Sequence, residues 1–502
     1  MSEKMVRRRS SAFEVQMETL EENKTKESTE SKASKESGSV SEGLEQFGED
    51  TDFHGLKRVF RRDYTLLRRT FWLFFFLAGL TGFIANTVDR LSYYLQYPHS
   101  SELDVMYDME LEFPAVTICN MNSYRLSALT DVDILHFGEK LHILDENRRL
   151  IHPEYYNQSW VDWVHGINWT ELAANDDEEN FDVLEFIRRT GHQLEDMILL
   201  CSWKGQHCGP ENFTSVFTHF GICYTFNADH SYKYVSRKAG AGNGLKLYIN
   251  IEEEEYLTSD VLAGQDAGLK MVIHAQEEPP FVKELGFGVL PGDHHFIAIQ
   301  KKYVHNLVPP WGNCYEGKLK YYSHYSVPAC RIECETDTIV KECGCKLAEM
   351  PGNTSVCLGH MYMGCAYPAL EEVEHSDLCS CQNPCDMTTY RRDISSVRLR
   401  DTTLDIIAEN NPQVKRETLS RDNLLVLNIY YEELCYETIR QIKAYSIPAL
   451  LSDIGGQMGL FIGASVLTLL HVIEAVGAVV GGKFLKTTKQ GRVSTTRVQS
   501  LK

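Results

Sequence analysis

Two long apolar runs interrupt an otherwise polar chain. Phe71–Val88 contains 18 residues without a charge, and Ile454–Val480 contains 27 residues with few polar interruptions. Each run is long enough to cross the hydrocarbon core of a bilayer as a helix, once the first is slightly extended. The pattern therefore predicts two membrane spans, at 71–92 and at 447–481.

Between these spans the pattern is that of a mixed α/β domain over residues 93–446. Short alternating or apolar stretches predict strands, and two stretches with helical spacing predict helices. The predicted strands are Ala115–Cys119, Leu245–Ile251, Met271–His274, Phe296–Ile299 and Leu424–Tyr431, and the predicted helices are Phe181–Thr190 and Pro368–Glu374. The glycine-rich stretch Gly240–Gly244 fits a hairpin turn better than a phosphate-binding loop.

Charge gives the chain an orientation. Basic residues are concentrated before the first span, in 51–70, and after the second, in 482–502. Since basic flanks stay cytoplasmic, we expect both termini inside the cell and the α/β domain outside. Residues 1–50 are polar and lack an apolar run, which predicts a disordered tail and no signal peptide. Most of the net charge of −20 then lies outside, where it could concentrate cations at a pore or simply keep the domain soluble.

The cysteines agree with an extracellular domain. All 15 lie between Cys119 and Cys435, and ten of them fall within 314–385. Thiols confined to one compartment favour disulfides, and no histidines at zinc-finger spacing accompany them. The same segment holds four candidate glycosylation sequons, at Asn157, Asn168, Asn212 and Asn353.

Several motifs are more specific than this patterning. They are Leu451-Ser-Asp-Ile-Gly-Gly-Gln-Met-Gly-Leu-Phe-Ile-Gly-Ala-Ser465, Phe113-Pro-Ala-Val-Thr-Ile-Cys-Asn120, Phe53-His54-Gly55, Cys330-Arg-Ile-Glu-Cys334, and Glu437-Thr-Ile439 followed by Lys443-Ala-Tyr445. Together they resemble the degenerin/epithelial sodium channel family, and within it the acid-sensing ion channel branch. The likeness runs from about Phe53 to Val480. It implies a trimer with a hand-like ectodomain (palm, finger, thumb, knuckle and β-ball) around a sodium-selective, voltage-independent, amiloride-sensitive pore.

The resemblance implies roles for residues of the pore. It assigns Gly463, Ala464 and Ser465 to the selectivity filter, Ser452, Asp453 and Gly456 to the gate, His471 and Glu474 to the inner pore, and His54 and Gly55 to cytoplasmic gating. Glycine tolerates unwinding, and unwound backbone at membrane depth can present carbonyl groups to a dehydrating sodium ion. His471 stands where the family usually has a second acid, so we expect a weaker inner ring of negative charge. Simple helix packing would also explain the glycines at 455 and 459.

The resemblance implies roles in the ectodomain as well. It assigns proton sensing to His99, Asp104, Glu432, Glu437 and Glu371, thumb-to-pore coupling to Tyr97 and Trp311, desensitisation to Leu434 and Cys435, and a chloride site to Lys238, Arg331 and Glu335. Histidine titrates near pH 6.5, and crowded carboxylates can be raised toward that range. However, the finger loop at 256–264 lacks the family's pair of acids, and three further acids are replaced, by Lys246, Tyr367 and Asn428. We therefore predict a shallow response to acid, or none in homomers.

The resemblance also implies a disulfide pattern. The implied pairs are Cys119–Cys223, Cys201–Cys208, Cys314–Cys385, Cys330–Cys381, Cys334–Cys379, Cys343–Cys365 and Cys345–Cys357. Five of these would staple the thumb, which we place at about 314–385. Cys435 is left over and is predicted to be a free thiol.

Other classes of protein fit less well. An ATP-gated trimeric channel has the same topology but lacks the Gly-Ala-Ser motif and this cysteine pattern. A membrane-anchored ectoenzyme would need a catalytic constellation, and neither His-Glu-x-x-His nor Gly-x-Ser-x-Gly occurs. We therefore predict a proton-gated sodium channel of the cell membrane, a homotrimer or a heterotrimer with related subunits. We expect no structural metal, no nucleic-acid partner, and no cofactor other than permeant sodium and bound chloride. The alternative is the same pore opened constitutively, by another ligand, or only within heteromers.

Overall fold

The computed structural model describes residues 51, 53–139, 141–176, 181–229, 232–257, 266–410, 416, 419–474 and 477. The predicted tails 1–50 and 482–502 lie outside this part of the chain, as does most of the finger loop at 256–264. The chain divides into two compact units, His99–Ile442 and the remainder. After the placement that the sequence predicts, we call them the ectodomain and the membrane unit.

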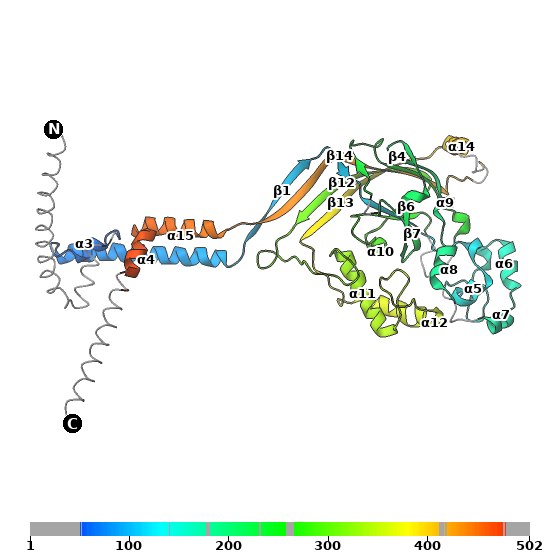
Figure 1. The fold of residues 1–502 in the computed structure, drawn as a ribbon, viewed down its shortest axis with the longest axis horizontal. Helices are drawn as coiled ribbons and strands as arrows, with labels where there is room; N and C mark the ends of the chain where they lie inside the picture. Colours follow the sequence, from blue (N-terminus) through cyan, green and yellow to red (C-terminus); the bar gives the residue numbers. More distant parts are fainter. Residues whose placement is uncertain are drawn as a thin grey trace, which may run out of the picture. The chain divides into compact units, whose positions relative to one another are not determined.

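The membrane unit is built on two apolar helical segments that run side by side (Figure 1). α4 spans Leu66–Tyr94 and is long and apolar enough to cross a bilayer. α15 spans Ile447–Ile462, and a short helix at Val466–Glu474 follows it after a bend of 74°. The sequence indicated that the backbone could unwind at Gly463, Ala464 and Ser465, and the second segment breaks at these residues.

Small residues on α4 set the distance between these helices. A Cβ added at Gly79 would lie 2.7 Å from the carbonyl oxygen of Phe461, and one at Gly82 would lie 2.9 Å from the Phe461 ring. By contrast, a Cβ at Gly455, Gly456 or Gly459 would meet nothing within 4 Å. Within one chain, close packing therefore depends on the glycines of α4, and those of α15 face open space.

The ectodomain is organised around a seven-stranded sheet. Its order is β13 (Asp386–Arg398), β12 (Asp293–His305), β14 (Leu424–Lys443), β9 (Leu245–Asn250), β4 (Ile198–Trp203) and β5 (Gln206–Cys208), with β1 (His99–Tyr107) also paired to β14. β12 and β14 are parallel, while β13, β9 and β4 pair antiparallel to their neighbours. Alternate residues of β9, such as Leu245, Leu247 and Ile249, are fully buried in the main core.

A second sheet packs on the same core. Its order is β11 (Phe287–Val289), β10 (Leu269–His274), β3 (Ala115–Asn120), β7 (Gly221–Phe226) and β6 (Phe213–Thr218). A small pair joins β2 (Leu111–Glu112) to β8 (Val235–Ser236). The stretch Gly240–Gly244 is therefore a turn but not a hairpin, because β8 pairs with β2 and not with β9, which begins at Leu245.

Helices form two further groups. The first contains α5 (Asp131–Phe137), α6 (Gln158–His165), α7 (Trp169–Asn175) and α8 (Val183–Thr190), which have a core of their own (Figure 1). In this group the carboxylate of Asp133, almost fully buried, pairs with Arg189 at 2.8 Å. The second group is the cysteine-rich segment, with α11 (Val327–Cys343), α12 (Gly359–Met361), the π-helix Tyr362–Ala366 and α13 (Tyr367–His375).

Seven disulfides join the same fourteen cysteines in the same pairs that the family resemblance implied. Cys435 is the one free cysteine, and all fifteen lie in the part of the chain that the structure describes. The predicted strands and helices are also present. β12 and β14 extend well beyond the apolar stretches from which they were predicted. Their polar second halves also pair with neighbouring strands while remaining partly exposed.

Candidate functional site

The break in the second apolar segment is formed by Gly463. It adopts a left-handed conformation, with φ 63° and ψ 27°, which glycine reaches without the steric cost that other residues meet. Its N–H donates to the Gly459 carbonyl at 3.1 Å, and the N–H of Ala464 donates to the Met458 carbonyl at 3.3 Å. These bonds end α15 and turn the backbone out of the helix.

Ser465 starts the helix that follows. Its hydroxyl accepts the N–H of Thr468 at 3.3 Å, and its own N–H donates to the Thr468 hydroxyl at 3.1 Å. This reciprocal arrangement is a capping box with threonine in place of the usual glutamate. This cap was not predicted from the sequence, although the Ser-x-x-Thr spacing is visible there.

His54 and Gly55, the predicted cytoplasmic gating pair, lie against this break. The N–H of His54 donates to the carbonyl of Ile462, the last residue of α15, at 2.9 Å. A Cβ added at Gly463 would overlap the His54 ring, and Gly55 has a φ of 87°. The structure thus brings together two motifs that lie more than 400 residues apart in the sequence. A glycine is required at position 463 both by its conformation and by this contact.

At the other end of α15, Tyr445 contacts the predicted gate. Its hydroxyl donates to the Asp453 carboxylate at 2.6 Å, and its ring packs against Tyr93 of α4 with centroids 5.5 Å apart. Ser446 caps α15 by accepting the N–H of Ala449 at 3.4 Å. Ser452 and Gly456 are exposed in the single chain, as are His471 and Glu474 on the short second helix.

The predicted desensitisation linker is an irregular stretch of β14. Ile299 of β12 lies opposite Tyr431, but Lys301 lies opposite Tyr436, so the residues from Glu432 to Cys435 have a single residue, Gln300, opposite them. The Gln300 amide donates to the Glu432 carboxylate at 2.6 Å, and the carbonyl of Leu434 accepts the Asp108 N–H at 3.1 Å. The linker is therefore a bulge in the pairing of β14 with β12.

Cys435 lies among acidic side chains of this bulge. Burial, a hydrogen bond to Glu433 and the negative charges of Glu433, Glu437 and Glu432 all raise the pKa of its thiol. Because the thiolate is the reactive form, we expect Cys435 to react slowly with thiol reagents at neutral pH.

The remaining predicted residues of the ectodomain are less closely grouped. His99 and Asp104 are exposed on β1, and Glu437 is exposed on β14. Arg331 pairs with Glu335, one turn along α11, at 3.0 Å, and Lys238 follows β8. Tyr97 lies in the membrane unit, with a φ of 51°, and Trp311 lies in the ectodomain. The coupling and chloride roles of these residues remain predictions.

A cavity of about 240 Å³ contains Glu335 and three acids that the sequence analysis did not single out. It is enclosed by α10 (Val282–Leu285), α11, α13 and the turn between β6 and β7. Glu284, Glu335, Glu349 and Glu374 line it. Lys283 pairs with Glu374 at 2.6 Å, and burial raises the pKa of each of the other three carboxyl groups. The predicted sensor Glu371 is exposed on α13, one turn before Glu374.

Glu278 is a further titratable group that the sequence analysis missed. It lies in the turn after β10, where burial and the neighbouring charge of Glu277 raise its pKa to about 7, despite a hydrogen bond to Ala275. Two histidines behave in the opposite way. Burial lowers the pKa of His274 to about 4, and burial with the charge of Lys246 does the same for His294. Glu278, and not these histidines, therefore changes charge in mild acid.

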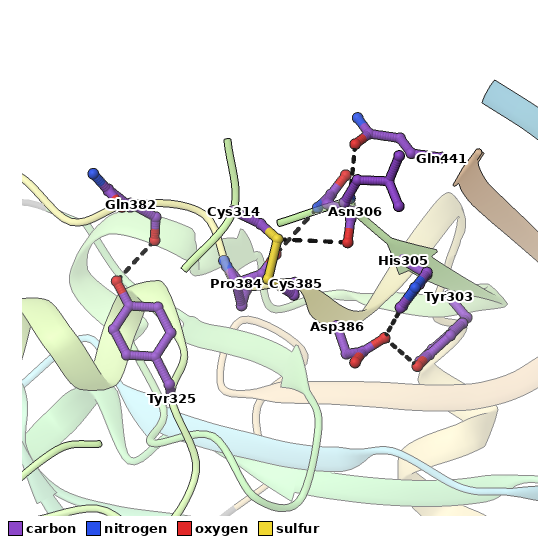
Figure 2. Close-up of a disulfide and its surroundings, with 11 residues drawn as sticks. Tyr303, His305, Asn306, Cys314, Tyr325, Gln382, Pro384, Cys385, Asp386 and Gln441 are labelled. Carbon is purple, nitrogen blue, oxygen red and sulfur yellow. Dashed lines mark hydrogen bonds and ion pairs between the residues drawn. A yellow bond between two sulfur atoms is a disulfide. The ribbon is translucent and has the colours of Figure 1, made fainter. Parts of the chain in front are cut away.

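A third polar group lies at the base of the cysteine-rich segment (Figure 2). Asp386 accepts hydrogen bonds from the Tyr303 hydroxyl and from the His305 ring, both at 2.6 Å, and Figure 2 shows its side chain between them. It directly follows Cys385, whose carbonyl accepts the Asn306 N–H at 2.7 Å. Burial opposes the charged form of Asp386, but the two hydrogen bonds hold its pKa below the ordinary value. Asp386 therefore stays ionised in mild acid.

The four sequons differ in how freely they are exposed. Asn157, Asn168 and Asn353 are exposed, and the amide of Asn168, at the start of α7, donates to Glu171 at 3.1 Å. The amide of Asn212 donates to the Tyr234 hydroxyl at 3.1 Å, and its carbonyl accepts the Gly209 N–H at 2.9 Å. A glycan on Asn212 would have to disrupt this packing.

Comparison with known proteins identifies the class. The chain matches the amiloride-sensitive sodium channel family over residues 47–475 and therefore belongs to that family of ion channels. Among curated proteins it is similar to acid-sensing ion channel 2 of Homo sapiens, with 39% identity over 454 residues that cover 88% of this chain and 87% of that protein. It is also similar to acid-sensing ion channel 1C of Danio rerio, with 38% identity over 463 residues that cover 89% and 86%.

Proposed function

We propose that this chain is a subunit of a trimeric, sodium-selective and amiloride-sensitive channel of the cell membrane, opened by extracellular protons. Each subunit crosses the bilayer twice, with α4 and with the bent segment from α15 onward, and both termini are cytoplasmic. The observation that carries the proposal is the helix break at Gly463–Ser465, in contact with His54, in a chain of the sodium channel family.

The break supports a role in ion selection. Backbone that leaves the helix at membrane depth is tolerated only where protein or a water-filled cavity surrounds it. In a trimer, three copies of Gly463, Ala464 and Ser465 would form a ring of carbonyl groups able to replace the hydration shell of sodium. The N–H of His54 donates to the Ile462 carbonyl at the end of α15. This bond would couple the cytoplasmic segment to the ring. Residues 71–88 carry no charge and the second span, 447–481, carries only Asp453 and Glu474, so the spans contain little charge for voltage to move.

Proton gating requires groups whose protonation changes packing. The proposed sensors are His99, Asp104, Glu432 and Glu437, together with Glu278. The acids that line the cavity between α10, α11 and α13 add to them, because burial raises their pKa toward the range of mild acid. Arg331 and Glu335 with Lys238 are proposed to bind chloride.

One observation favours a second candidate, the same pore with little or no response of homomers to protons. His274 and His294 stay neutral in mild acid, and Glu371 is exposed and not enclosed. Lys246 lies opposite Asn428 across β9 and β14, where the family resemblance implied acids. A channel with so few titrating groups could open by another ligand or only within heteromers.

Whole-cell recording tests both candidates. An extracellular acid step should evoke an amiloride-sensitive sodium current in cells that express the full chain, and His99→Ala should abolish it. A steep pH–current curve that collapses in Glu371→Gln but survives His99→Ala would contradict this assignment of the sensor. If acid evokes no current, the variant Ser452→Phe is recorded, because bulky residues at this position hold related channels open. Current in this variant shows a pore that conducts but that protons do not open, and no current shows a chain that does not conduct.

A further inference from the structure

The segment that joins the two helices of the second span uses side chains where a helix uses its backbone. In a continuous helix the N–H of Ser465 would donate to the Phe461 carbonyl, and the N–H of Thr468 to the Ala464 carbonyl. Here the first donates to the Thr468 hydroxyl at 3.1 Å and the second to the Ser465 hydroxyl at 3.3 Å. The two hydroxyl oxygens are themselves 3.3 Å apart. Two side chains therefore replace two helical hydrogen bonds.

The two residues of this box differ in exposure. Ser465 is exposed, whereas Thr468 is only 4% exposed and Ala464 only 5%. A buried N–H or hydroxyl that loses its partner cannot easily find water instead. The Thr468 hydroxyl is therefore the part of the box that solvent cannot replace.

The carbonyl groups of the break are used unequally. Ile462 accepts the N–H of His54 at 2.9 Å, and Ser465 accepts the N–H of Leu469 at 3.2 Å, as the cap of the second helix. The Ala464 carbonyl lies between these two bonds, and the amide that a helix would give it donates to Ser465. It is thereby kept out of the helical ladder within the described part of the chain.

We propose that Thr468 is a positioning residue of the selectivity filter, whose hydroxyl holds Ser465 so that the Ala464 carbonyl stays available to sodium. This inference rests on the proposed function. Thr468 itself touches no ion. Without its hydroxyl, the Ser465 N–H would regain a partner most simply at the Phe461 carbonyl, which would close the helix across the filter.

The test compares three substitutions in the full-length channel, recorded by whole-cell patch clamp in sodium and in potassium. Thr468→Val removes the hydroxyl and keeps the shape, and Thr468→Ser keeps the hydroxyl. Thr87→Val is the matched control, since the Thr87 hydroxyl on α4 is buried and makes no hydrogen bond within the described part of the chain. If acid does not open the wild type, all three are measured in the Ser452→Phe background.

We expect Thr468→Val to lower the sodium-to-potassium permeability ratio by about fivefold, the factor that corresponds to one hydrogen bond. Thr468→Ser should retain the wild-type ratio, and so should Thr87→Val. A wild-type ratio in Thr468→Val would overturn the inference but leave the proposed function intact. If Thr468→Val gives no current, Thr468→Ser decides, because current with wild-type selectivity in it supports the inference and silence overturns it. Absence of sodium current in both the wild type and Ser452→Phe would overturn the proposed function, and this inference with it.

Discussion

Replacement of Glu278 by glutamine should remove a pH dependence from the stability of the ectodomain. Glu278 has a pKa of about 7, against an ordinary value of 4.5, mainly because it is buried. A shift of this size corresponds to about 3 kcal/mol of preference for the neutral form in the fold. Glutamine has nearly the same shape as protonated glutamate, so the variant is a permanent mimic of the acid form.

The sign follows from proton linkage. Because the folded state has the higher pKa, it binds more protons than the unfolded chain between about pH 7 and pH 4.5, and its stability falls as pH rises through 7. Lowering the pH from about 7.4 to about 6.0 should therefore stabilise the wild type by about 1 kcal/mol at this site. For a domain of this size the melting temperature should rise by about 1–2 °C.

Thermal unfolding of the detergent-solubilised, full-length protein at the two pH values measures this effect. The contribution should vanish in Glu278→Gln, which should also be more stable than the wild type at the higher pH. Glu277→Gln, in the same turn but exposed, is the matched control. It should keep the pH dependence with a slightly lower midpoint, since the charge of Glu277 raises the pKa of Glu278. The reasoning is refuted if Glu278→Gln retains the wild-type pH dependence.

Three further predictions concern other sites. Cys435→Asn should change the rate of desensitisation in fast-perfusion recordings without preventing trimer assembly, because Cys435 belongs to the bulge of β14 and to no disulfide; a native disulfide at Cys435 in mass spectrometry would contradict this. Asn353→Gln should remove one glycan and so increase the gel mobility of the mature protein. Asn212→Gln should leave the mobility unchanged, because the Asn212 amide is held by hydrogen bonds and carries no glycan. Asp133→Ala should destabilise the fold by about 3 kcal/mol, since it removes a buried carboxylate that accepts hydrogen bonds from Arg189 and from Thr130 at the start of α5; equal melting temperatures for it and for the exposed control Asp131→Ala would contradict this.

The sequence predicted the elements of the ectodomain well where apolar residues alternate with polar ones. β9 is such a case, because its buried positions recur at every second residue. The extensions of β12 and β14 were missed, because the residues after Ile299 and Tyr431 are largely polar. Their strand conformation comes from pairing with residues distant in the chain, such as Lys301 with Tyr390, and no local pattern encodes that pairing.

The candidate sensors show a similar limit. The resemblance directs attention to positions where the family has acids, and it correctly indicates that Lys246, Tyr367 and Asn428 are not acidic. It gives no weight to Glu278, because two glutamates before two prolines form no distinctive pattern. The raised pKa of Glu278 is a consequence of burial after folding. Burial of single polar residues is a tertiary property, and the sequence offers no signal for it.

The helix break shows how much of a structural feature a single glycine in the sequence can predict. Gly463 could be read from the sequence as a point where the helix can unwind, but glycines at 455 and 459 carry the same signal and remain helical. What distinguishes position 463 is its surroundings. Ser465 and Thr468 supply a cap for a new helix immediately afterwards, and His54 supplies a donor for the carbonyl of Ile462. A glycine followed within two residues by a capping box is therefore a more specific sign of a broken span than a glycine alone, because each helix end then has partners for its unpaired groups.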